Sequence, residues 1–78
     1  MTKKEFAYPN LKAELSRYNV RAEDLSNLLG IAKPNVYNRL TGEKDFTLSE
    51  MITIQTYLEL KAINKKFELE YLFSREAI

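Results

Sequence analysis

The chain has 78 residues, of which 45% are hydrophobic and 29% charged, and its net charge is +1. This length predicts one small domain over residues 1–78 with a thin core, and no apolar run approaches the roughly 20 residues of a membrane span. The chain has neither cysteine nor histidine, so we expect no disulfide, metal site or cofactor, and no enzyme acting on a small-molecule substrate.

The first predicted helix covers about residues 11–18. Leu11 and Leu15 stand four residues apart, a spacing that places both on one face of a helix. Asn10 is the predicted N-cap, because its side chain can accept a hydrogen bond from a free backbone N–H. Asn19 can adopt the left-handed conformation that ends such a helix.

A second helix is predicted over residues 22–29. Leu25, Leu28 and Leu29 share one face, and acidic residues in the first turn suit the helix dipole. Its expected N-cap, Arg21, is a poor capping residue.

A third helix is predicted over about residues 33–41, after Gly30 has ended the second. Pro34 is tolerated because it lies in the first turn, where backbone N–H groups have no partner within the helix. Val36 and Leu40 give this helix one apolar stripe.

Thr47 and Glu50 stand three residues apart, as in a capping box, and predict the start of a fourth helix over about residues 48–61. The β-branched run ITIQTYL leaves a strand as the alternative, but the length of the apolar pattern favours a helix. A turn is expected over residues 64–66.

The tail, residues 67–78, fits two structures. Apolar and acidic residues alternate in KFELEYLF as in a strand, whereas their i, i+4 spacing fits a short helix, which we favour. Its large apolar side chains exceed what a small core needs, so we expect a dimer contact, with folding back on the first and fourth helices as the alternative. These residues are Phe67, Leu69, Tyr71, Leu72 and Phe73.

The stretch LLGIAKPNVYNRLTG, residues 28–42, joins two short helices through a glycine, as in a helix-turn-helix. The second helix then presents a polar stripe clear of its apolar one. That stripe contains Lys33, Pro34, Tyr37, Asn38 and Thr41.

Charge is unevenly distributed. Residues 1–44 carry a net charge of +3 and residues 45–78 a net charge of −2. Residues 25–42 include no acid, only Lys33 and Arg39, and a small acid-free surface can meet phosphate even on a nearly neutral chain.

The segment AEDLSNLLGIAKPNVYNRLTGEKDFTLSE resembles the helix-turn-helix of Cro and repressor proteins of lambda-type phages and of XRE-like bacterial regulators. The resemblance covers about residues 11–58. It implies an all-α, lambda repressor-like bundle of four to five short helices. It also implies a cytoplasmic regulator of a bacterium or phage-infected cell, which binds a palindromic DNA operator through the major groove as a homodimer.

Carried over by position, the resemblance places Lys33, Pro34, Tyr37 and Asn38 against bases. Asn38 can pair with an adenine edge, and Lys33 can meet a guanine edge or a phosphate. Pro34 can contact a thymine methyl group or simply start the helix, and Tyr37 can face DNA or the core.

Phosphate contacts are expected at the end of the third helix. The resemblance implies them for Thr41, Gly42 and Lys44, and an exposed Arg39 could reach phosphate or pair with Glu43.

Two positions depart from the resembled pattern. Ala22 stands where a phosphate-gripping glutamine is common, and Ser26 stands where alanine is preferred. Serine is small enough for the turn, whereas alanine cannot hold phosphate. Ala22 and the near-neutral net charge therefore support the alternative function, a protein–protein module such as an antirepressor or antitoxin-like partner.

Overall fold

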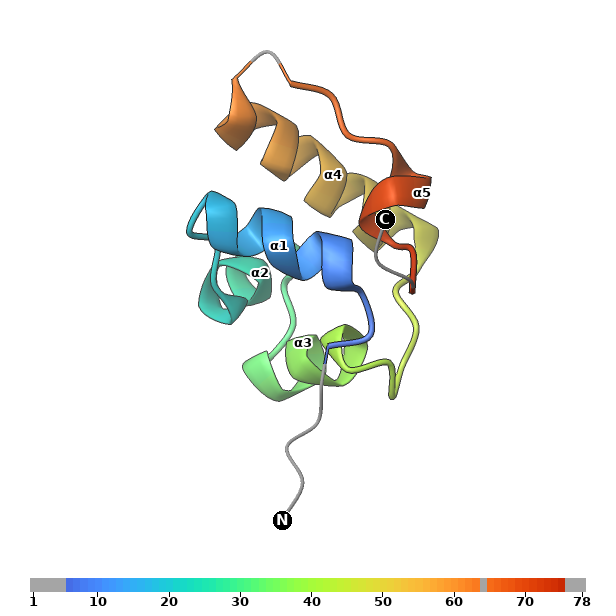
Figure 1. Ribbon diagram of the computed structural model, residues 1–78. Helices are drawn as coiled ribbons and strands as arrows, with labels where there is room; N and C mark the ends of the chain where they lie inside the picture. Colours follow the sequence, from blue (N-terminus) through green and yellow to red (C-terminus); the bar gives the residue numbers. More distant parts are fainter. Residues whose placement is uncertain (1–5, 64, 76–78) are drawn as a thin grey trace.

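The computed structural model describes residues 6–63 and 65–75, which form five helices and no strand, confirming the all-α prediction. The helices are α1 (Pro9–Arg17), α2 (Ala22–Leu29), α3 (Lys33–Leu40), α4 (Leu48–Ala62) and α5 (Leu69–Leu72). In Figure 1, α1 crosses the middle of the molecule, with α4 above it and α3 below it. None of these helices has both the length and the apolarity that a membrane crossing needs.

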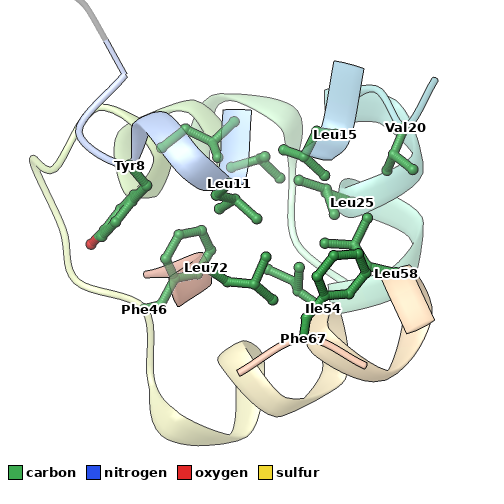
Figure 2. Close-up of a cluster of buried hydrophobic side chains, with 12 residues drawn as sticks. Tyr8, Leu11, Leu15, Val20, Leu25, Phe46, Ile54, Leu58, Phe67 and Leu72 are labelled. Atoms are coloured by element: carbon green, nitrogen blue, oxygen red, sulfur yellow. The ribbon is translucent and has the colours of Figure 1, made fainter. Parts of the chain in front are cut away.

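One hydrophobic core holds the helices together. Leu11 and Leu15 enter it from α1, Ile54 and Leu58 from α4, and Leu72 from α5 (Figure 2). Each of the five is at most 5% exposed. Full burial of such a side chain contributes about 1.5–3 kcal/mol to the free energy of unfolding. Because these residues come from the first helix and the last two, the stability of the core depends on contacts between the two ends of the chain.

The start of α1 differs from the prediction. Its N-cap is Tyr8 rather than Asn10, because Pro9 occupies the first helical turn, where its missing N–H costs no hydrogen bond. Asn10 therefore lies inside the helix, buried, and its side chain donates to the backbone carbonyl of Tyr71 at 3.1 Å. The predicted left-handed conformation of Asn19 is confirmed, with φ 55°.

The helix prediction for the fourth element is confirmed, with one residue more than expected. The Glu50 N–H donates to Thr47 Oγ1 at 3.1 Å, and the Thr47 N–H donates to Glu50 Oε1 at 3.0 Å. This capping box satisfies two N–H groups at the helix start. The expected turn over residues 64–66 includes Asn64, which lies outside the described residues.

The tail forms a short helix, as favoured, and it folds back on α1 and α4. Phe67 and Leu72 are 4% and 0% exposed, Tyr71 and Phe73 pack against the core, and Leu69 is partly buried. The expectation of an exposed apolar patch is therefore wrong. The small core needs these side chains, which removes the reason for placing a dimer contact on the tail.

Candidate nucleic-acid interface

Ser26 closes the corner between α2 and α3. Its hydroxyl donates to the Ile31 carbonyl at 2.5 Å, and its own carbonyl accepts from the N–H groups of Gly30 and Ile31 at 2.9 and 3.2 Å. Gly30 has φ 70°, the left-handed conformation predicted for the end of α2. Serine thus adds a side-chain hydrogen bond across the turn. Alanine would also fit at this position but could not form that bond.

The two sides of α3 are sharply different. Val36 and Leu40 are 0% and 3% exposed and lock the helix to the core. Lys33 and Pro34 are exposed, and Tyr37 is 48% exposed rather than tucked against the core. We call the outward stripe the α3 face; it consists of Lys33, Pro34, Tyr37, Asn38 and Thr41, of which the last two are half-buried.

An acid lies within reach of the first residue of the α3 face. Lys33 Nζ is 3.8 Å from Glu23 Oε1 of α2, and both side chains are more than half exposed. An exposed pair of this kind contributes about 0–1 kcal/mol. Lys33 can therefore leave Glu23 for another anion at little cost.

Arg39 does not belong to the α3 face. Its side chain is only 17% exposed, and its Nε lies 3.0 Å from Glu50 Oε1 at the start of α4. A second guanidinium nitrogen donates to the Asn35 carbonyl at 3.1 Å. The expectation of an exposed Arg39 is wrong, because the capping carboxylate at the start of α4 reaches back to its guanidinium group.

The loop after α3 turns its donors inward. The Thr41 hydroxyl, the Gly42 N–H and the Lys44 N–H all donate to carbonyl oxygens of α3, at 2.9–3.2 Å. These bonds fix the loop against the helix end. Lys44 itself is exposed, so its ammonium group can bind an anion such as a DNA phosphate.

Arg75 packs on this loop, and sequence reasoning missed it. Its Nη2 donates to Asp45 Oδ1 at 3.1 Å and to the Tyr8 hydroxyl at 3.2 Å. Its Nη1 lies 2.8 Å from the point that a Cβ on Gly42 would occupy. No local pattern links residues 30 or more positions apart, so only the folded chain places this cation at the end of α3.

Two further cations lie beside the α3 face. Lys12 of α1 and Arg21, which precedes α2, line a hollow of about 170 Å³ that also includes Phe6 and Tyr37. Lys12 Nζ sits 5.3 Å from the centre of the Phe6 ring. Both cations are exposed and add positive charge next to Tyr37.

No family model, curated protein or solved structure matches the chain. Among residues 6–63 and 65–75, no group of three or more acidic side chains is placed to hold a metal ion.

Proposed function

We propose that the protein is a sequence-specific DNA-binding transcriptional regulator that reads the major groove of an operator with the α3 face. The observation that carries this proposal is the two-sided character of α3, which is anchored by Val36 and Leu40 while a polar and aromatic stripe faces outward. The major groove of B-DNA admits an α-helix. The resemblance to Cro and repressor proteins of phages supports the same function.

Base reading falls to the α3 face. Asn38 pairs with the N6 and N7 edge of an adenine, and Lys33 donates to the O6 and N7 edge of a guanine. Each such contact discriminates by about 1–3 kcal/mol, more than the 0–1 kcal/mol that Lys33 loses on leaving Glu23. Tyr37 and Pro34 offer apolar surface to a thymine methyl group.

Backbone contacts surround that face. The Lys44 ammonium group meets a phosphate at one end of α3, where Gly42 adds no side chain to the loop. The Thr41 hydroxyl donates to a phosphate there once it leaves the Tyr37 carbonyl. Lys12 and Arg21 meet phosphates on the other side of Tyr37. Contacts of this kind position a protein on the duplex without specifying its sequence.

A protein–protein module is the second candidate, and the ion pairs favour it. Glu23 neutralises Lys33 and Glu50 neutralises Arg39, so the surface around α3 carries less positive charge than the sequence alone indicates. The methyl side chain of Ala22 offers no donor to phosphate.

Selection of random duplex DNA with the purified protein tests the proposal. We expect one enriched sequence motif, and a binding constant whose logarithm falls linearly with the logarithm of salt concentration. If no sequence is enriched and the protein does not bind DNA at low salt, the proposal is refuted and the protein–protein module remains.

A further inference from the structure

The tail after α5 is fixed to the loop that follows α3. The Phe73 ring packs against Phe46 and against Tyr8, with ring centres 5.3 and 5.8 Å apart. Tyr8 and Phe46 are both buried, so these contacts anchor the tail in the core. Figure 1 shows the red end of the chain beside the yellow-green loop. Arg75 follows two residues after Phe73 and reaches the loop itself.

Several contacts hold the Arg75 guanidinium group at once. Its central carbon lies 5.1 Å from the centre of the Tyr8 ring, and its Nη2 donates to the Tyr8 hydroxyl at 3.2 Å and to Asp45 Oδ1 at 3.1 Å. Its Nη1 lies against Gly42, 2.8 Å from the point that a Cβ would occupy. Each contact of a half-exposed arginine is weak by itself. Together they fix one orientation of the guanidinium group over the loop.

Asp45 is an acid directly beside the proposed phosphate contact of Lys44. Its side chain is 85% exposed, and Arg75 is the cation paired with it. The Cα atoms of adjacent residues are about 3.8 Å apart, which is less than the Debye length of about 8 Å at physiological salt. A free carboxylate at Asp45 would therefore compete with a DNA phosphate for the Lys44 ammonium group.

We infer that Arg75 is a positioning residue for the phosphate contact of Lys44. By pairing with Asp45, Arg75 occupies the competing carboxylate and leaves Lys44 to the DNA. The inference rests on the proposed DNA binding and extends it to the tail, which lies far from the helix-turn-helix in the sequence.

Arg75 differs in this respect from Lys33. A single exposed ion pair joins Lys33 to Glu23, so Lys33 can leave its acid for a base. The Arg75 guanidinium group also stacks on the Tyr8 ring and donates to its hydroxyl. Arg75 therefore stays with Asp45 when DNA binds, and its effect on DNA passes through Lys44.

A double-mutant cycle between Arg75 and Lys44 tests this route. Arg75→Gln removes the charge and keeps a polar side chain, and it should weaken binding to the selected duplex at low salt by about threefold to tenfold. In a Lys44→Ala background the same change should cost less than about twofold, because the group through which it acts is gone. A direct phosphate contact by Arg75, or a general loss of stability, would cost the same in both backgrounds. Equal costs therefore overturn the inference.

Removal of the competing acid should restore binding. Arg75→Gln combined with Asp45→Asn should bind within about twofold of the unaltered chain, because no carboxylate is left beside Lys44. Glu70→Gln is the matched control, since it removes an equal charge from an exposed position of α5 and should not restore the Arg75→Gln variant. Equal restoration by both changes, or none by Asp45→Asn, contradicts the assigned role.

The same titrations separate this inference from the proposed function. If the unaltered chain does not bind duplex DNA at low salt, the proposed function fails and this inference fails with it. If the unaltered chain binds and the cycle shows no coupling between Arg75 and Lys44, only this inference fails. Circular dichroism should show the same helical spectrum for all these variants.

Discussion

The Arg39 guanidinium of α3 and the Glu50 carboxylate of α4 are joined by a hydrogen bond of 3.0 Å. The same carboxylate oxygen accepts the N–H of Thr47, the N-cap of α4. Both side chains of the pair are 17% exposed, so water screens the contact only partly. One carboxylate thus fixes the start of α4 and its position relative to the α3 face.

Arg39→Ala should lower the free energy of unfolding by about 1–2 kcal/mol, because the partly buried Glu50 loses a charged donor. Urea unfolding measures this loss. The salt slope of DNA binding should stay the same, since the guanidinium already has partners within the chain. A stable variant with a reduced salt slope would instead place Arg39 on a phosphate.

Lys44→Ala is the counterpart of the Arg39 change. The Lys44 ammonium group is exposed, so its loss should leave stability nearly unchanged and weaken binding to all sequences about equally. The slope of log K against log salt should flatten by about 0.9, the value for one phosphate contact. An unaltered slope would show that Lys44 lies off the DNA backbone.

Asn38→Ala should relax the sequence preference at one base pair. A bidentate adenine contact is worth about 1–3 kcal/mol, and its loss should appear on the selected site and not on random duplexes. Binding titrations on both DNAs provide the comparison. Equal losses on the two would mean that Asn38 reads no base.

Gly30→Ala and Gly42→Ala form a matched pair, since both glycines have positive φ values of 70° and 87°. Left-handed backbone costs a residue with a Cβ about 1–2 kcal/mol, and at Gly30 no atom lies within 4 Å of the added carbon. At Gly42 the carbon would lie 2.8 Å from Arg75 Nη1 and 3.1 Å from Ala7 Cβ. Gly42→Ala should therefore be the more destabilising change.

The two glycine variants are compared by urea unfolding. Repeating Gly42→Ala in an Arg75→Ala background should leave most of its extra cost, because Arg75 Nη1 ends a flexible side chain that can move aside, whereas Ala7 Cβ is fixed to the backbone. Equal costs for the two glycines would show that Arg75 and Ala7 yield freely.

Tyr71 and Glu14 make a second contact between distant parts of the chain. The Tyr71 hydroxyl donates to Glu14 Oε2 at 2.7 Å, and Glu14 is 2% exposed. This hydrogen bond, followed by burial and the charge of Glu14, raises the pKa of Tyr71 above its ordinary 10.0. The hydroxyl proton of Tyr71 is therefore held more tightly in the folded chain than in the unfolded one.

Tyr71→Phe should cost about 1–3 kcal/mol of unfolding free energy at neutral pH, because a buried carboxylate oxygen loses its donor. Since the folded pKa is raised, this advantage of the unaltered chain is complete below pH 10 and declines as pH rises through the folded value. Urea unfolding of both proteins from about pH 7 to about pH 11 measures the difference. Tyr37→Phe, which removes a hydroxyl from a half-exposed ring, should cost less at neutral pH. A difference that persists undiminished to the highest pH would contradict the assigned contact.

Local patterns in the sequence were enough to predict where the helices lie and which side of α3 faces outward. Apolar spacing, the Thr47 and Glu50 capping box, and Gly30 act within a few residues, so they can be read locally. Val36 and Leu40 identify the buried side of α3 in the same way. The spacing of these two apolar residues, four positions apart on a helix, also predicts the outward stripe that carries the proposed base contacts.

The contacts between residues far apart in the chain could not be predicted in this way, because they form only when the helices pack. This packing turned Arg39 to Glu50, buried Phe67 and Leu72, and brought Arg75 to the loop after α3. Each outcome depends on how helices far apart in sequence pack. A core this small needs large apolar side chains from distant segments, and no local pattern specifies which ones enter it.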